Sequence, residues 1–176
     1  MKRWLRRAVC LVMFFTACSA SADDAAIQKC RYQTVFVSNV ELVADMDRNS
    51  PEEVKYYSDL QAEATVMITK FFKGEGFAIA ESPDPANERL LIINTKAVFN
   101  AGNRALRWFG GIGGAGKASA DVTMEAIEPR SGHLFSKKNA QDTLRMGGFG
   151  GSAPGLLMGV IDTAWNYLIT DIYAIK

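Results

Sequence analysis

The sequence has few of the side chains that build metal centres and nucleophilic sites. It contains a single histidine, His133, so a metal site with several imidazole ligands is excluded. Cys30 and His133 are conceivable as a nucleophile pair, but nothing near Cys30 marks an oxyanion hole. A histidine in a hairpin turn is the simpler interpretation of His133. We therefore expect no enzyme activity, no metal site and no cofactor.

The start of the chain lacks the length of apolar sequence that a membrane-spanning helix needs. Lys2, Arg3, Arg6 and Arg7 precede an apolar run over residues 8–17. That run is about half of the roughly 20 residues required to cross a bilayer. Basic residues followed by a short apolar run predict a bacterial export signal that is removed from the mature protein.

Two processing sites compete behind this run. The stretch FTAC, which ends at Cys18, resembles the lipobox of bacterial lipoproteins. It predicts a signal peptide of residues 1–17, acylation of Cys18 and a tether of residues 18–30. Ser19 is similar to residues that permit sorting to the outer membrane, where the acyl chains would hold the protein on the periplasmic face. The alternative is ordinary signal cleavage after ASA, which gives a signal of residues 1–22 and a soluble periplasmic protein.

Removal of the signal leaves an acidic chain with little cysteine. Four of the 20 basic residues are lost and all 19 acidic residues stay, so 16 minus 19 gives a net charge of −3. We therefore expect no nucleic-acid partner. Cys10 is discarded and Cys18 is acylated in the lipoprotein interpretation, which leaves Cys30 alone. Without acylation, Cys18 could pair with Cys30 in an oxidising periplasm.

Several segments of the remaining domain, residues 31–176, carry the signatures of β-strands. β-branched and aromatic residues mark the first strand, and alternation of apolar with polar residues marks the strand after Lys117. The strands are expected at residues 32–40, 76–80, 90–100, 118–126 and 134–138. A strand, helix, strand order of this length predicts that the first two strands are parallel.

Two segments predict helices. In the first, Ser50 suits the N-cap, Pro51 suits the first helical position, and Glu53 completes a capping box. Apolar residues then recur at alternating spacings of three and four until Gly74 ends the helix. The second helix is expected over residues 154–173.

Two motifs resemble ligand-binding loops and fall short of them. In GGIGGAGKAS, Lys117 is followed by Ala118 and a strand pattern, whereas a phosphate-binding loop needs a Ser or Thr and a helix there. We expect no nucleotide binding, and we interpret these glycines as a turn between two strands. In DMDRNS, residues 45–50, the spacing suggests a calcium loop, but Tyr56 stands where the bidentate glutamate should be.

A basic and aromatic cluster is one candidate for an interaction surface. It consists of Arg104, Arg107, Trp108 and Phe109, immediately before the glycine-rich stretch. Such side chains suit a lipid headgroup layer or an anionic partner. A solvated hairpin tip is the alternative.

Two glycines of the second helix are the other candidate. Gly155 and Gly159 stand four residues apart and would let another helix approach closely. Asp162 interrupts any apolar run of bilayer length in this helix. Packing of the helix on the protein's own sheet is the alternative to a contact with a partner or membrane.

The region GNRALRWFGGIGGAGKASADVTMEAIEPRSGHLF also carries a family resemblance. It resembles the uncharacterised bacterial lipoproteins grouped as domain of unknown function 4410. Their pattern is a basic residue, a glycine-rich turn, an alternating strand and a turn that ends in glycine. The resemblance covers residues 32–138 and is strongest over residues 102–132. It implies an exported, membrane-tethered α/β domain and supplies no catalytic residues.

These observations predict a single α/β (α+β) domain. We expect a mixed sheet of four or five strands, a crossover helix after the first strand and a C-terminal helix. The leading functional expectation is a non-enzymatic cell-envelope lipoprotein that binds or assembles with other envelope components. A self-oligomerising module that uses its glycine-rich segments at the membrane is the alternative. A periplasmic hydrolase that depends on Cys30 is the third.

Overall fold

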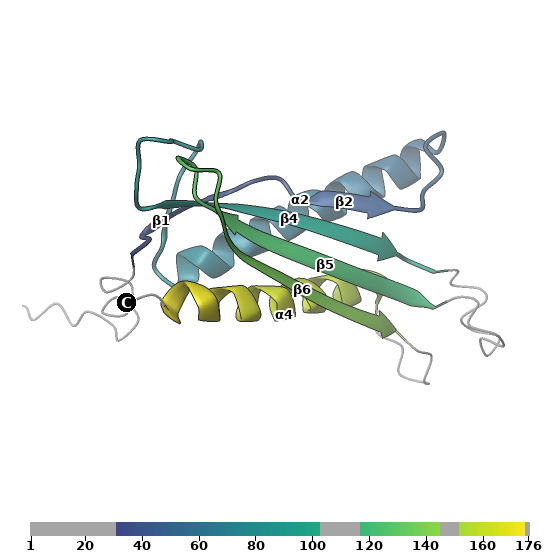
Figure 1. Ribbon diagram of the computed structural model, residues 1–176. Helices are drawn as coiled ribbons and strands as arrows, with labels where there is room; N and C mark the ends of the chain where they lie inside the picture. Colours follow the sequence, from purple (N-terminus) through teal and green to yellow (C-terminus); the bar gives the residue numbers. More distant parts are fainter. Residues whose placement is uncertain (1–30, 103–116, 145–151, 175–176) are drawn as a thin grey trace, which may run out of the picture.

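The computed structural model describes residues 31–102, 117–144 and 152–174. They form one mixed sheet of six strands with two helices packed on one of its faces (Figure 1). The elements in chain order are β1 Thr34–Val37, β2 Glu41–Ala44, α2 Pro51–Gly74, β3 Ala78–Ile79, β4 Leu90–Asn100, β5 Ala118–Ile127, β6 Leu134–Leu144 and α4 Ala153–Ala174. The predicted fold class is confirmed, with one strand more than expected.

The strand order is β3, β1, β4, β5, β6, and β2 lies beside β4 beyond the end of β1. β1 pairs in parallel with β3, as the order of elements predicted, and also with the first half of β4. β2 pairs in parallel with the second half of β4. β4, β5 and β6 form an antiparallel meander. β4 and β5 are thus direct neighbours, and residues 101–117 connect them, as the strand pattern on both sides of the glycines predicted.

The long strands turn one face toward the helices and leave the other open. On β4, Ile93, Ala97 and Phe99 are buried, while the residues between them face the other side. The register places Ala97 beside Val122 of β5, and Val122 beside Ala140 of β6. Because side chains alternate along a strand, these residues form one apolar surface under α2 and α4.

The start of α2 follows its predicted signals, with one correction. The Ser50 hydroxyl accepts a hydrogen bond from the Glu53 N–H at 3.3 Å, and Pro51 is the first helical residue. The Glu53 carboxylate, however, accepts from the Asp47 N–H at 2.8 Å and not from Ser50, so the capping box is only half formed. The Asp47 side chain accepts from the Asn49 N–H at 2.9 Å, which makes this segment a turn that leads into the helix.

Two expected strands differ from the structure. The first one, residues 32–40, is interrupted: β1 ends at Val37, the Ser38 N–H and hydroxyl both donate to the Ile93 carbonyl, and β2 begins at Glu41. The last one was expected to end at Lys138, but β6 continues to Leu144. Its second half lies at the edge of the sheet and carries mainly polar side chains, so it shows no strand pattern.

Aromatic side chains join the two helices to each other. The Trp165 ring of α4 lies 4.8 Å from the Phe71 ring and 6.5 Å from the Phe72 ring of α2, measured between centroids. Both helices thus close over a single apolar core. Within the described ranges, neither helix has the length and apolar character that a membrane crossing requires.

Candidate functional site

The predicted glycines of α4 lie outside the apolar core, on the side of the helix that borders the edge strand β6. Gly155 and Gly159 are both exposed, while Leu157 and Ile161 between and after them are buried in the core. The helix therefore does pack on its own sheet, but the glycines do not make that contact. A Cβ atom added at Gly159 would meet no atom within 4 Å.

These glycines border a groove between α4 and the edge strand β6. The groove has a volume of about 470 Å³, and its lining includes Ala140 and Leu144 of β6 together with Gly159 and Thr163 of α4. Ser152 lies at one end of the groove. Its hydroxyl accepts the Gly155 N–H at 3.1 Å and caps the helix. The walls are uncharged apart from Asp142, so the groove suits a close contact with small or apolar groups.

Other predicted site residues lie outside the described part of the chain. These are Cys18, Cys30, Arg104, Arg107, Trp108 and Phe109. The lipid anchor, the nucleophile pair and the basic and aromatic cluster therefore stay predictions. His133 is described, and it lies in the turn between β5 and β6, where the simpler interpretation placed it.

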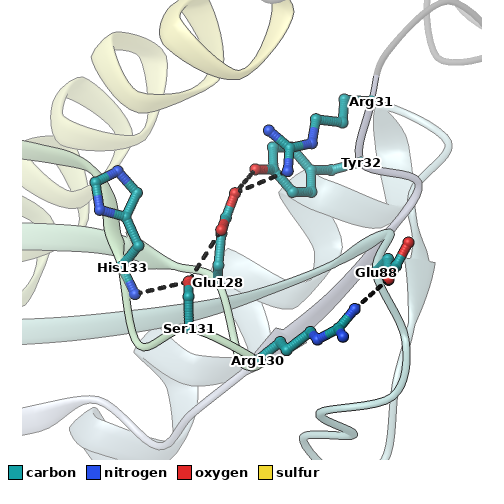
Figure 2. A network of polar contacts seen from close by, with 7 residues as sticks. All are labelled: Arg31, Tyr32, Glu88, Glu128, Arg130, Ser131 and His133. Carbon is teal, nitrogen blue, oxygen red and sulfur yellow. Dashed lines mark hydrogen bonds and ion pairs between the residues drawn. The ribbon is translucent and has the colours of Figure 1, made fainter.

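A carboxylate that sequence reasoning missed organises the corner where the chain enters the domain (Figure 2). The Tyr32 hydroxyl donates a hydrogen bond to Glu128 Oε1, and the Ser131 hydroxyl donates to Oε2 at 3.0 Å. The Arg31 guanidinium lies 3.2 Å from Oε1. The hydrogen bond from Tyr32 lowers the pKa of Glu128, helped by Ser131, by the charge of Arg31 and by His133, while partial burial opposes the shift.

The backbone around Glu128 explains why the carboxylate is held in place. The Glu128 N–H donates to the His133 carbonyl at 3.0 Å, and the Gly132 N–H donates to the Glu128 carbonyl at 2.9 Å. Gly132 has a φ of 66°, a conformation that glycine adopts without a steric penalty. The Ser131 hydroxyl also accepts the His133 N–H at 3.1 Å. The turn is thus closed by its own hydrogen bonds.

Glu128 thus holds Tyr32 and Arg31, where the chain enters the domain, to the turn between β5 and β6, and we call this set of contacts the clamp. Tyr32 is only 1% exposed, and its ring packs edge-on against Phe135 at a centroid distance of 5.3 Å. Glu128 already accepts two hydrogen bonds and an ion pair, so its carboxylate is ionised and has little capacity to act as a base. A second ion pair, between Arg130 and Glu88, joins the same turn to the loop before β4.

The open face of the sheet carries a row of charged side chains. Lys96 of β4 pairs with Glu41 of β2 at 2.8 Å, and Lys137 of β6 pairs with Glu125 of β5 at 2.8 Å. All four side chains line one shallow hollow of about 350 Å³. In the described ranges, no three His, Cys, Asp or Glu side chains are grouped so that they could hold a metal ion.

Comparison with known proteins identifies the fold. The sequence matches no protein-family model and no curated protein. Among solved structures, a point variant of the PelC dodecamer from Paraburkholderia phytofirmans has a TM-score of 0.52 at 15% identity, and the match covers 84% of this chain and 92% of that chain. This chain and PelC therefore share a fold.

Two further matches have lower scores. The hypothetical protein CT253 from Chlamydia trachomatis has a TM-score of 0.47 at 10% identity, covering 81% of this chain and 96% of that chain. The lipoprotein GNA1162 from Neisseria meningitidis has a TM-score of 0.32 at 11% identity, covering 78% of this chain and 96% of that chain.

Proposed function

We propose that this chain is a non-enzymatic lipoprotein of the cell envelope that works by assembling with further copies of itself. Acylated Cys18 tethers it to the periplasmic face of the outer membrane, and the domain from residue 31 makes the protein contacts. Membership of the lipoprotein family grouped as domain of unknown function 4410 is part of this proposal. It rests on the pattern around the glycine-rich stretch.

The observation that carries the assembly part is the fold shared with PelC over 84% of this chain, because that protein crystallised as a dodecamer. The open groove beside α4 supports the same proposal, since Gly159 leaves room there for a closely packed neighbour. Other envelope proteins are the alternative partners.

The anchor is tested by metabolic labelling with palmitate. We expect the full-length protein to be labelled, labelling to be lost in Cys18→Ala, and processing to be sensitive to globomycin. A Cys30→Ala variant is the matched control and should be labelled like the wild type. An unlabelled protein that begins at Asp23 would contradict the anchor and favour a soluble periplasmic protein.

The assembly is tested by the molar mass of the exported protein, measured by light scattering in detergent. We expect a defined oligomer at micromolar concentration. A strictly monomeric protein, both in detergent and after removal of the acyl chains, would contradict self-assembly and leave another envelope protein as the partner.

The basic and aromatic cluster of residues 104–109 has a separate proposed role. Gly102 and Lys117, which flank this segment, lie at the end of the sheet opposite to Arg31 (Figure 1). β4 has 11 residues, so the two ends are about 35 Å apart. Because both flanking residues lie at the end of the sheet far from Arg31, we propose that the cluster binds an anionic envelope partner and not the bilayer that holds Cys18. Binding of Arg104→Ala/Arg107→Ala protein to anionic vesicles should equal that of the wild type.

A further inference from the structure

The edge strands β2 and β6 each have an unpaired edge, and the two edges are level with each other along the strand direction. β6 pairs only with β5, and β2 pairs only with β4, among the residues described. The registers align these edges, because Leu42 is level with Ala97, Ala97 with Val122 and Val122 with Ala140. At the other end of the sheet, β3 covers the edge of β1. Since unpaired strand edges pair readily with another chain, the edge of β6 and the edge of β2 are potential contacts.

The charges on the open face alternate from one edge to the other. The row reads Glu41 on β2, Lys96 on β4, Glu125 on β5 and Lys137 on β6. It begins with an acid at one edge and ends with a base at the other. If the β2 edge of a second copy were placed against β6, its Glu41 would lie level with Asn139 and diagonal to Lys137, and the alternation would continue across the junction.

The helix flank above the β6 edge is small and uncharged. Ser152, Gly159 and Thr163 stand on this side of α4, and the Thr163 hydroxyl is turned back to the Gly159 carbonyl at 3.0 Å. Asp171, nearer the end of α4, forms an ion pair with Lys138 of β6 and accepts a hydrogen bond from the Ser136 hydroxyl of the same strand. Asp162, in the first half of the helix, is exposed and does not line the groove, so this flank is free to meet another surface without burying a charge of the helix.

The helix flank above the β2 edge has the same character. The Thr65 hydroxyl of α2 accepts the Val40 N–H at 3.1 Å, which fixes the side of the helix that faces this edge. Val54, Ser58 and Ala62 lie on that side, at spacings of three and four residues from Thr65 and from one another. They are all exposed, and they form a second small and uncharged surface.

The geometry points to a head-to-tail contact in which the β6 edge of one copy meets the β2 edge of the next. The sheet then continues from copy to copy, Lys137 meets Glu41 of its neighbour on the open face, and the flank of α4 packs on the flank of α2 below. β2 and β6 both run parallel to β4, so the joining strands are parallel. A contact between two different surfaces propagates, and it closes into a ring or grows as a filament. This inference rests on the proposed self-assembly and names its surfaces.

Two blocking substitutions test the contact in the full exported protein. Gly159→Arg places a long charged side chain on the α4 flank, where the added Cβ meets no atom within 4 Å. Ala62→Arg does the same on the exposed flank of α2. Glu63→Arg is the matched control, because Glu63 is exposed and stands one residue from Ala62 and two from Thr65, which places it off the side of α2 that carries Val54, Ser58 and Ala62. Circular dichroism and thermal unfolding check that each variant is folded.

We expect Gly159→Arg and Ala62→Arg to be monomeric by light scattering in detergent, and Glu63→Arg to assemble like the wild type. An equal mixture of the two blocked variants has one intact β6 side and one intact β2 side, so it should form a dimer that grows no further.

The possible failures are distinguishable. A monomeric wild type overturns the proposed self-assembly. An assembled wild type whose blocked variants also assemble overturns only the surfaces named here. Blocked variants that are monomeric alone and stay monomeric when mixed overturn the head-to-tail geometry and favour a symmetric contact.

The charge row is tested separately by Glu41→Gln. We expect about a threefold weaker association and a flatter dependence of the association constant on salt, because an exposed ion pair contributes little. An association constant that keeps the salt dependence of the wild type would overturn the Lys137 to Glu41 contact.

Discussion

The two faces of the sheet share the same strands and differ in chemistry. Under the helices, Ile93, Phe99 and Met124 are buried, whereas Lys96 and Glu125 of the same two strands meet solvent on the open face. Burial of apolar surface stabilises the fold, while exposed ion pairs contribute little to it. The difference indicates that the covered face holds the domain together and that the open face and its edges are available for recognition.

The largest effect is expected for Phe99→Ala on the covered face. Phe99 is 1% exposed and packs edge-on against Tyr57, so its removal leaves a cavity and should lower the free energy of unfolding by about 3–5 kcal/mol. Val98→Ala, one residue away on the open face and 50% exposed, should cost less than about 0.5 kcal/mol. Urea denaturation of both variants measures the contrast, and equal losses would contradict it.

The next effect is expected at the corner, where a side chain of the core reaches a surface carboxylate. Tyr32→Phe keeps the ring against Phe135 but removes the donor to Glu128. Hydrogen bonds to charged groups contribute about 1.5–3 kcal/mol, so a loss near the lower end of this range is expected in urea denaturation. A loss below about 0.3 kcal/mol would mean that water replaces the hydroxyl at no cost.

The same corner predicts a dependence of stability on pH. The pKa of Glu128 is lowered in the folded protein, so the stabilisation is complete above the unfolded pKa of about 4.5 and is lost as the pH falls through the folded pKa. We expect Glu128→Gln to have a flatter decline of unfolding free energy below pH 4.5 than the wild type. Parallel pH profiles for the two proteins would contradict this role.

A smaller effect of opposite sign is expected for Thr95→Val. Thr95 is 3% exposed on the covered face, and its hydroxyl has no hydrogen-bond partner there. Valine has nearly the same shape without the polar atom, so the variant should gain about 1 kcal/mol. Thr123→Val on the open face is the control and should change stability by less than about 0.5 kcal/mol. Destabilisation by Thr95→Val in thermal unfolding would point to an ordered water beside the hydroxyl.

The smallest effect is expected for the ion pair between Lys137 and Glu125. Both partners meet solvent, so Lys137→Gln should lower the free energy of unfolding by about 0.2–1 kcal/mol, and added salt should reduce the difference. A double-mutant cycle with Glu125→Gln measures the coupling. A coupling above about 1.5 kcal/mol would show that the open face also stabilises the domain.

The elements that sequence reasoning located are those with strong local signals. β4 has the predicted bounds, and α2 begins at Pro51 and ends at Gly74 as its caps indicated. The second half of β6 escaped prediction, because at an edge only Ala140 is buried and the residues around it are polar. β2 was not predicted as a separate strand. The first strand is interrupted where the Ser38 hydroxyl donates to the Ile93 carbonyl, and β2 begins after this break.

The candidate sites could be predicted only in part. Gly155 and Gly159 were selected by their spacing as a candidate contact, which stays a prediction, and their orientation depends on which side of α4 is apolar in the packed domain. The contact of Tyr32 with Glu128 joins residues 96 positions apart, and the registers of β1, β4 and β5 create it. No local pattern encodes such a contact, because it depends on the finished sheet.

The clamp at Tyr32 also determines how the domain responds to tension. A pull on the N-terminal segment first loads the bonds of Tyr32 and Arg31 to Glu128 and then draws on β1, which lies between β3 and β4. Tension on the anchor proposed at Cys18 would therefore reach these bonds before it reaches the sheet.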